Sequence, residues 1–321
     1  MKREIKNVAV VGAGRMGHGI AGGFVLGGKE VFLCDVSEGV LRQAVSMIGD
    51  ELRELSEWGA VPPGDIQPIL DRLHPLTRLE HAVSEADMVV EAVNENLELK
   101  KQVFNKLDAI CPERTILASN TSTFRPSEYA QATNRPDKVV GTHYFFPSLL
   151  VPLVEIVRSP FSSDETVETA YECLKSSGKT PVVIQKEIVG FVGNRLQWAL
   201  QREAFYLVEQ GIASAQDVDI VTKASFGARM PFTGIFEMME LQGGYDGLSA
   251  IWRYMFPHLC SSKEPSPLAI EKVKRGETGS KTGKGFYEWT PESAQTRRKE
   301  LAKDLFRVVR GLLDEIGKDG H

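Results

Sequence analysis

The feature that most constrains the fold is a glycine-rich turn that lies between two short apolar runs near the N-terminus. Residues 7–35 read as a β-branched run, the turn, an amphipathic stretch and a second apolar run. Within the turn, Gly12, Gly14 and Gly17 follow the pattern GxGxxG, and Asp35 comes 18 residues after Gly17. This order of segments predicts one βαβ unit, which implies a parallel sheet.

The same turn predicts a dinucleotide site. Gly12 permits a tight turn, Gly14 lets the backbone approach a pyrophosphate, and Gly17 allows the helix to pack on the strand. Free N–H groups at the helix start, around Met16, suit the anion. Asp35 would accept a hydrogen bond from the adenosine ribose and repel a 2′-phosphate, so NAD is expected rather than NADP. The alternative is a structural turn without a ligand.

The rest of the first half alternates strand-like and helical segments, as is typical of a doubly wound α/β fold. After Asp35, one helical pattern runs to Trp58 and a second runs through Leu73, so we expect a helical hairpin inserted after the second strand. Further strand-like runs are found at Met88–Val93, Thr115–Ala118, Lys138–Thr142, Pro152–Val157 and Pro181–Ile184. We therefore predict a mostly parallel sheet of the Rossmann type.

The second half of the chain has a helical pattern, and we place the domain change at about residue 187. The predicted domains are an NAD-binding Rossmann domain at 1–187 and an all-helical domain at 188–321. Gly211 ends the first helix of the second domain at the expected cap position, and Ser214 begins the next helix. The last helix carries an apolar stripe, which serves either packing within the chain or a dimer seam.

Composition narrows the classes of partner. The formal net charge of −5 gives no general attraction to nucleic acid or to an anionic membrane. No apolar run reaches the roughly 18 residues of a membrane span, and the run near the N-terminus is too short for a signal peptide. The four cysteines are scattered without a CxxC pair, which indicates reduced thiols. We expect a cytoplasmic protein with a small-molecule substrate and without a metal site.

A histidine and a glutamate suit proton abstraction from a secondary alcohol. His143 ends a predicted strand on the ligand side of the sheet, and imidazole titrates near neutrality, so His143 is a candidate general base. Glu155 lies in an apolar strand-like run, where an unpaired carboxylate would be costly. We predict that Glu155 orients His143 and stabilises its imidazolium form. The alternatives are a packed or solvated histidine and a solvated glutamate on an edge strand.

Ser119 is a further candidate catalytic and substrate-binding residue. It lies at the C-terminal end of a predicted strand, where open α/β sheets bind ligands, and its hydroxyl could hold the substrate oxygen. The sequence Ser-Asn-Thr-Ser that begins at Ser119 is equally typical of a turn or a helix cap.

Several segments together resemble the L-3-hydroxyacyl-CoA dehydrogenase family in order and spacing. They cover nearly the whole chain and are Glu91–Asn96 with Lys100, Ser119–Ser122, Gly141–Pro147, Leu153–Val157, Gly190–Arg195 and Gly283–Tyr287. The resemblance implies NAD as the cofactor and reversible oxidation of the secondary hydroxyl of an L-3-hydroxyacyl-CoA to the 3-keto compound. It also implies a role in fatty acid metabolism and a homodimer that forms through the helical domain.

The resemblance further implies roles for single residues. The side-chain amide of Asn194 is expected to reach the reacting oxygen, and Glu95 and Lys100 are expected to contact the nicotinamide half of the cofactor. The alternatives are an N-cap role for Asn194 and an exposed charge pair at a helix start for the other two residues.

Three departures from the family's usual pattern concern the substrate. Phe146 occupies the place of an asparagine that is usual in members acting on acyl-CoA. Residues 51–57 read ELRELSE where the family usually presents serine and lysine to the CoA phosphates. Arg229 occurs where relatives similar to gulonate 3-dehydrogenase (lambda-crystallin) and carnitine dehydrogenase also carry an arginine, and a guanidinium suits a carboxylate. A small free 3-hydroxy acid held by Arg229 is therefore a second substrate class, and a crystallin-like NAD-binding structural protein is a third interpretation.

Overall fold

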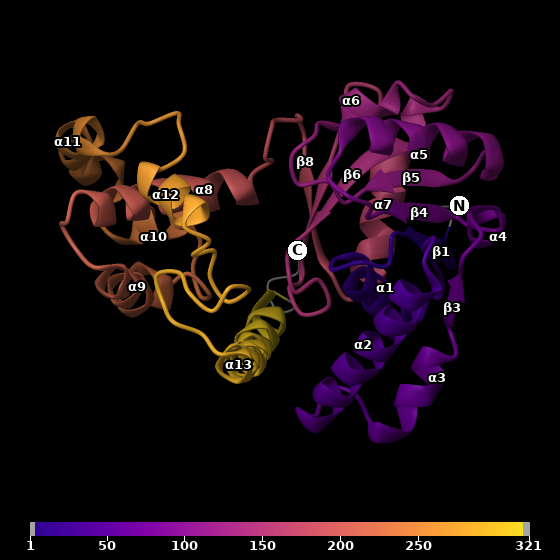
Figure 1. Cartoon of the computed structure of the whole chain (residues 1–321). Coiled ribbons are helices and arrows are strands. Elements are labelled where there is room, and N and C mark those ends of the chain that lie inside the picture. The colour runs from indigo at the N-terminus through magenta and orange to yellow at the C-terminus, as the bar shows by residue number, and fades with distance from the viewer. Residues whose placement is uncertain (1–3, 317–321) are drawn as a thin grey trace. The chain divides into compact units, whose positions relative to one another are not determined.

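The computed structural model describes residues 4–316, and the chain divides into two compact units, Met1–Asn194 and Arg195–His321. In Figure 1 the first unit runs from indigo to magenta, and the second is orange to yellow. The first unit extends beyond residue 187, the expected domain change, because the backbone N–H groups of Val192 and Gly193 donate to Glu155 in the same unit.

An eight-stranded sheet forms the centre of the first unit. Its strands are β1 Asn7–Val11, β2 Glu30–Cys34, β3 Leu73–Leu76, β4 Met88–Glu91, β5 Ile116–Ser119, β6 Val139–Tyr144, β7 Leu153–Val157 and β8 Thr180–Ile184. The strand order is β3-β2-β1-β4-β5-β6-β7-β8, and all neighbours are parallel except β6 and β7. The prediction of a mostly parallel, doubly wound sheet is confirmed. The order reverses between β1 and β4, and the carboxyl ends of strands at such a point are where these sheets bind ligands.

Helices cover the sheet on both sides, with α5 and α6 on one side and α1 on the other in Figure 1. The helices of this unit are α1 Gly17–Leu26, α2 Glu38–Glu57, α3 Ile66–Leu70, α4 Leu79–Val83, α5 Leu97–Ile110, α6 Pro126–Ala130 and α7 Asp164–Ser176, with 3₁₀ turns at Pro63–Asp65 and Pro136–Lys138. Side chains of α4, α5 and α6 join the sheet in a buried core that includes Val89, Phe104, Leu117 and Tyr129. This core fixes the strand ends that carry the site described below.

The inserted hairpin differs from the prediction in its second helix. α3 ends at Leu70, so the expectation of a helix through Leu73 is wrong. Residues Leu73–Leu76 instead form β3, which pairs with β2 at the edge of the sheet. This strand is only four residues long and contains Pro75, so it shows no clear alternation of polar and apolar residues. A proline, which has no N–H, is tolerated in an edge strand.

The second unit is helical, as predicted. Its helices are α8 Gly193–Glu209, which begins two residues before the unit boundary, α9 Ala215–Ala224, α10 Ile235–Leu241, α11 Gly244–Met255, α12 Pro267–Lys274 and α13 Pro291–Ile316, with 3₁₀ turns at Phe226–Ala228 and Phe256–His258. Gly211 adopts a φ of 65° just after α8, and Ser214 caps α9 by accepting a hydrogen bond from the backbone of Asp217. Both caps agree with the sequence pattern. Within residues 4–316, no helix has the length and apolar character to cross a membrane.

Candidate active site

The glycine-rich turn has the shape that a dinucleotide requires. Gly12 has a φ of 103°, and a Cβ there would lie 2.6 Å from the carbonyl oxygen of Ala92. A Cβ on Gly17 would lie 1.8 Å from the carbonyl oxygen of Gly12, so only glycine allows α1 to start this close to β1. At Gly14, by contrast, a Cβ would meet no atom within 4 Å, which leaves the backbone open to a ligand. The turn therefore fits the pyrophosphate of NAD.

Asp35 lies directly beside this turn. One carboxylate oxygen accepts a hydrogen bond from the backbone N–H of Ala13 at 3.0 Å, and the other accepts from that of Ser37 at 3.0 Å. The carboxylate is thereby fixed at the end of β2, next to the glycines. This is the place at which a ribose hydroxyl could donate to it.

His143 and Glu155 form a buried pair at the carboxyl end of β6. The antiparallel register of β6 and β7 places the two residues directly opposite each other. Nδ1 of His143 lies 2.7 Å from Oε2 of Glu155, and each residue is 2% exposed. The rings of Phe145 and Phe191 pack against the imidazole, with centroids 4.6 and 5.4 Å away. Glu155 is therefore neither solvated nor on an edge strand, and the expected pairing of its side chain with His143 is present.

The carboxylate of Glu155 is held in its charged form. Burial alone would raise its pKa, but His143 and the backbone N–H groups of Gly193 and Val192 donate to the carboxylate and lower its pKa below the usual value. The two N–H groups lie 2.9 and 3.0 Å from Oε1. Because one oxygen binds the backbone and the other binds the imidazole, the orientation of the histidine is fixed.

Ser122, rather than Ser119, is the hydroxyl beside this histidine. Oγ of Ser122 lies 3.1 Å from Nε2 of His143. Ser119, the serine selected from the sequence, is completely buried in β5 and donates to Oε2 of Glu91 at 2.6 Å. In the sequence, both serines lie at or beyond the predicted end of the same strand, so the pattern alone does not separate them. The structure brings His143, Glu155 and Ser122 together, whereas Ser119 contacts Glu91 instead.

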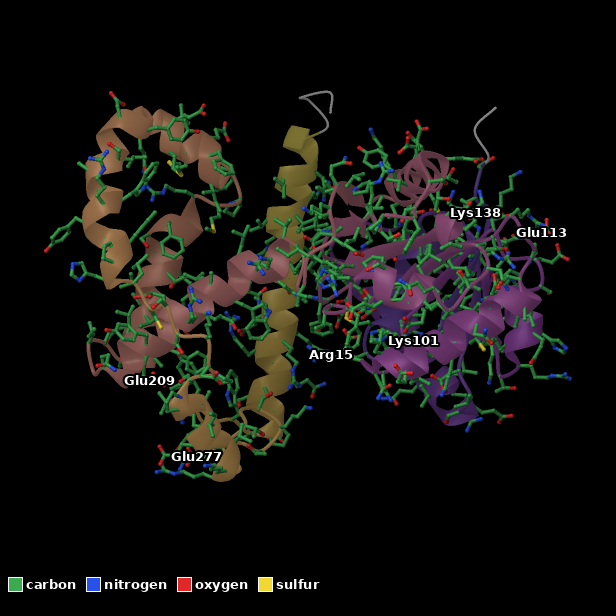
Figure 2. The ribbon with its side chains drawn as sticks, turned by 90° about the horizontal axis from the view of Figure 1, so that it is seen from above. Arg15, Lys101, Glu113, Lys138, Glu209 and Glu277 are labelled. Atoms are coloured by element: carbon green, nitrogen blue, oxygen red, sulfur yellow. The ribbon has the colours of Figure 1, made fainter. Side chains whose placement is uncertain are left out.

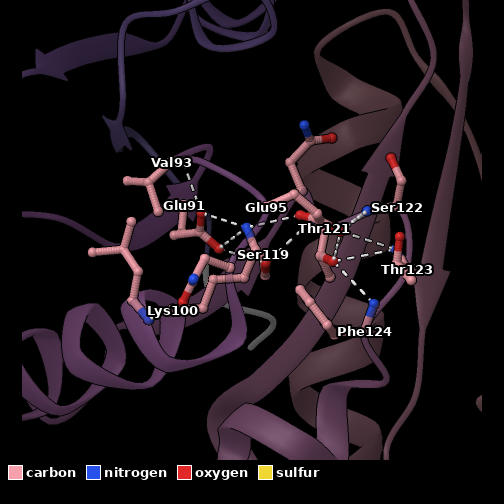
Figure 3. Close-up of polar contacts among 12 residues, drawn as sticks. Glu91, Val93, Glu95, Lys100, Ser119, Thr121, Ser122, Thr123 and Phe124 are labelled. Carbon is pink, nitrogen blue, oxygen red and sulfur yellow. Dashed lines mark hydrogen bonds and ion pairs between the residues drawn. The ribbon is translucent and has the colours of Figure 1, made fainter. Parts of the chain in front are cut away.

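Ser119 belongs to a buried polar network that is centred on Lys100 (Figure 3). The ammonium group of Lys100, only 1% exposed, lies 2.9 and 3.1 Å from the two carboxylate oxygens of Glu91 and 3.3 Å from Glu95. Glu91 is completely buried and also accepts from the backbone N–H of Val93 at 2.7 Å. Lys100 is thus not an exposed helix-start charge, and Glu91 is a charged residue of this region that the sequence analysis did not select.

Glu95 links this network to the turn that carries Ser122. Its Oε1 accepts hydrogen bonds from the hydroxyl of Thr121 at 2.5 Å and from the backbone N–H groups of Ser122 and Thr123, both at 3.1 Å. Figure 3 shows these bonds converging on one carboxylate oxygen. The position of the Ser122 hydroxyl therefore depends on Glu95 and, through it, on Lys100.

The remaining sequence candidates lie in different places. The side-chain amide of Asn194 donates to the carbonyl oxygen of Ser122 at 3.3 Å, which places Asn194 next to the His143 group. Phe146 is exposed after β6, and the guanidinium of Arg15 lies 4.3 Å from its ring centroid; Figure 2 labels Arg15. Arg229 is an exposed residue of the second unit and follows the 3₁₀ turn Phe226–Ala228.

Comparison with known proteins assigns the chain to a family. Residues 7–188 match the model of the NAD binding domain of 3-hydroxyacyl-CoA dehydrogenase, and residues 190–289 match that of its C-terminal domain. A 5-formyl-3-hydroxy-2-methylpyridine 4-carboxylate 5-dehydrogenase of Mesorhizobium japonicum is 30% identical over 307 residues, which cover 95% of this chain and 98% of that protein. A probable 3-hydroxybutyryl-CoA dehydrogenase of Bacillus subtilis is 34% identical over 292 residues, which cover 91% of this chain and all of that protein.

A solved structure gives the same result. The crystal structure of a 5-formyl-3-hydroxy-2-methylpyridine 4-carboxylic acid 5-dehydrogenase, described as an NAD⁺ dependent dismutase, superposes with a TM-score of 0.89 at 30% identity. The match covers 96% of this chain and 98% of that chain. The predicted family, cofactor and enzyme class are thereby confirmed. The chain belongs to the 3-hydroxyacyl-CoA dehydrogenase family and is an NAD-dependent oxidoreductase.

Proposed function

We propose that the protein oxidises the secondary hydroxyl of a 3-hydroxyacyl substrate, with His143 as the general base. The observation that carries this proposal is the buried hydrogen bond of 2.7 Å between His143 and Glu155. A histidine held in this way by a carboxylate has a fixed tautomer and is stabilised when it takes up a proton.

The tautomer follows from the acceptors around the ring. A carboxylate can only accept, so Nδ1 of His143 carries the proton and donates it to Glu155. Nε2 then has a free lone pair, which faces the hydroxyl of Ser122 at 3.1 Å. A substrate hydroxyl placed at this point would lose its proton to Nε2, and Glu155 would stabilise the resulting imidazolium. NAD, when bound, would accept the hydride from the carbon that bears this hydroxyl.

Other residues are proposed to hold the reactants. Ser122 lies within hydrogen-bond distance of the base and is proposed to bind the substrate oxygen. Ser119 and Lys100 are almost completely buried, so they are not proposed to contact the substrate. The amide of Asn194 lies beside the same turn and is proposed to contact the reacting oxygen. Glu95 is half exposed, so it is proposed to contact the nicotinamide half of the cofactor while it holds the turn.

For the substrate, the first candidate is an L-3-hydroxyacyl-CoA. Both family models are named for 3-hydroxyacyl-CoA, and the Bacillus subtilis relative is named as a probable 3-hydroxybutyryl-CoA dehydrogenase. Such a substrate would place the protein in fatty acid metabolism.

A second candidate is a small free hydroxy acid, and a specific observation favours it. The end of α2 carries Asp50, Glu54 and Glu57, and the single arginine nearby, Arg53, already pairs with Asp50. This acidic surface is unsuited to the phosphates of CoA. The Mesorhizobium japonicum relative is named for a free pyridine carboxylate. In this case Arg229 is proposed to bind the carboxylate.

A comparison of rates tests both the chemistry and the substrate. The wild type, His143→Ala, Glu155→Gln and Arg229→Met are assayed with 3-hydroxybutyryl-CoA and with free 3-hydroxy acids, including gulonate and carnitine. We expect His143→Ala to lose roughly 10²–10⁴-fold in kcat, because general base catalysis contributes that much. A His143→Ala enzyme with unchanged kcat would refute the mechanism. If Arg229→Met loses activity only with free acids, a free hydroxy acid is the substrate class. If its rates with both substrate classes equal those of the wild type, the free-acid candidate is removed.

We also propose that the protein is a homodimer through the helical unit. That unit exposes many large apolar side chains, among them Leu196, Trp198, Ile220, Val221, Phe232, Phe236, Leu241, Tyr254, Phe256, Val273, Leu301 and Val308. A surface of this kind is typical of a protein interface, and we propose that a second copy of the chain covers it. Light scattering should give twice the mass of one chain, and a monomer would contradict the proposal.

The buried free thiols Cys34, Cys111 and Cys173 are in keeping with the expected cytoplasmic location.

A further inference from the structure

His18 is a buried titratable side chain that the proposed reaction does not use. It is the second residue of α1 and is 4% exposed. Its Nδ1 lies 2.9 Å from the carbonyl oxygen of Gly14, and its Nε2 lies 3.3 Å from Oε1 of Glu51 on α2. The imidazole therefore connects the glycine-rich turn to the inserted helical hairpin.

Both ring nitrogens of His18 face groups that can only accept hydrogen bonds. The bond to Gly14 requires a proton on Nδ1, and the bond to the carboxylate of Glu51 requires a proton on Nε2. Only the imidazolium form satisfies both. Burial lowers the pKa of His18, but the hydrogen bonds to Glu51 and Gly14 outweigh it and raise the pKa above 6.5. With both groups charged, the pair His18–Glu51 has no net charge.

Loss of this proton would place an uncompensated negative charge next to the cofactor turn. The net charge of the pair would change from zero to −1, carried by Glu51, whose Oε2 is buried and has no hydrogen-bond partner among the described residues. Gly14, whose carbonyl His18 holds, is also the turn residue with open space around it. A diphosphate that approaches the backbone there would be repelled by the unpaired carboxylate.

Other charged groups border α1, and a test must distinguish their effect on NAD binding from that of His18. Arg15 precedes α1, and Asp35 lies beside the turn that leads into it. Lys179 lies over α1 at Gly23, with its ammonium bonded to the carbonyl oxygens of Ser148, Leu149 and Val151. Burial lowers the pKa of Lys179 to about 8, so Lys179 titrates in an overlapping pH range.

We propose that His18 is a cofactor-positioning residue, whose imidazolium fixes the carbonyl of Gly14, cancels the charge of Glu51 and thereby favours the diphosphate of NAD. The inference goes beyond the proposed reaction, because it depends only on NAD binding. A change of one unit charge close to a diphosphate corresponds to about a tenfold change in Kd.

Fluorescence titration with NADH from about pH 6.5 to about pH 9 tests this proposal, since an imidazole whose pKa is raised loses its proton only above the usual value. All variants carry His143→Ala, which removes the other buried histidine among the described residues. In the parent, affinity should fall about tenfold as the pH rises. In His18→Gln, affinity should be weak and independent of pH, because Glu51 remains charged. In Glu51→Gln, affinity should be tight and independent of pH.

Three controls make the result specific. His81→Gln replaces an exposed histidine on α4 and should keep the parent profile. ADP-ribose, which retains the diphosphate, should compete with the pH profile of NADH, whereas adenosine should not. Both test variants retain Lys179, so their expected lack of a slope would show that Lys179 does not cause the slope of the parent. The proposal is overturned if His18→Gln and Glu51→Gln keep the parent pH profile. If His18→Gln does not fold, the profile of Glu51→Gln decides alone.

Discussion

Replacement of Lys100 by methionine should destabilise the first unit far more than a typical surface substitution. Methionine fills nearly the same volume but removes the ammonium group that lies 2.9 and 3.1 Å from the carboxylate of Glu91. Glu91 is completely buried, so its charge would lose its only cationic partner among the described residues. Breaking a buried pair in this way costs about 3–5 kcal/mol. For a unit of this size, that free energy corresponds to a fall in Tm of about 6–20 °C.

The neighbouring residue provides a matched control. Lys101 pairs with Glu98 at 2.8 Å on the exposed face of α5, and Figure 2 labels its side chain at the surface. Lys101→Met should cost about 1 kcal/mol or less, as is usual for a surface ion pair. The double variant Lys100→Met/Glu91→Gln should recover much of the loss, because the buried charge is then gone. Urea and thermal unfolding measure all four proteins. A Lys100→Met variant as stable as Lys101→Met would refute the reasoning.

Gly17→Ala should lower the free energy of unfolding by about 1–3 kcal/mol and weaken NADH binding, because the new Cβ would lie 1.8 Å from the carbonyl oxygen of Gly12. Unchanged NADH affinity in a fluorescence titration would contradict this prediction. Glu155→Gln should be less stable than the wild type at neutral pH. Because the folded-state pKa of Glu155 is lowered, this difference should persist above about pH 4.5 and vanish as the pH falls through the folded pKa, which urea unfolding at several pH values can follow. Iodoacetamide should label the partly exposed Cys260 first in the native protein, because burial raises the pKa of the other three thiols to about 11 or 12. Mass spectrometry identifies the labelled cysteine, and a buried cysteine that is labelled first would contradict the fold.

The sequence predicted those parts of the fold and site that depend on local chemistry. Gly12 and Gly17 must be glycines because backbone atoms occupy the space of each Cβ, and Gly14 leaves the backbone open, so the spacing of the three glycines identified the turn. The pairing of His143 with Glu155 was predictable because a buried carboxylate requires a partner. Features that depend on packing were harder to predict. β3 has no alternating pattern, and the choice between Ser119 and Ser122 depends on where β5 ends, which sequence patterns locate only to within about two to four residues.

The charged network around Lys100 was missed for a related reason. Its members are separated by up to 28 residues, and each one alone resembles an ordinary surface charge. Only the three-dimensional arrangement shows that Glu91 and Lys100 are enclosed. The extent of the first unit to Asn194 likewise depends on backbone N–H groups that reach Glu155, which carry no sequence signal.

The reversal of chain direction at β7 allows the base and its carboxylate to come from a single hairpin. Because the pair is aligned by cross-strand register, the loop 145–152 that joins the strands could gain or lose residues without separating the two side chains. A slip of one residue within β7 would instead turn Glu155 to the opposite face of the sheet. Variation among relatives in how they enclose different substrates is therefore expected in the length and sequence of this loop, while the strands on either side keep their alignment.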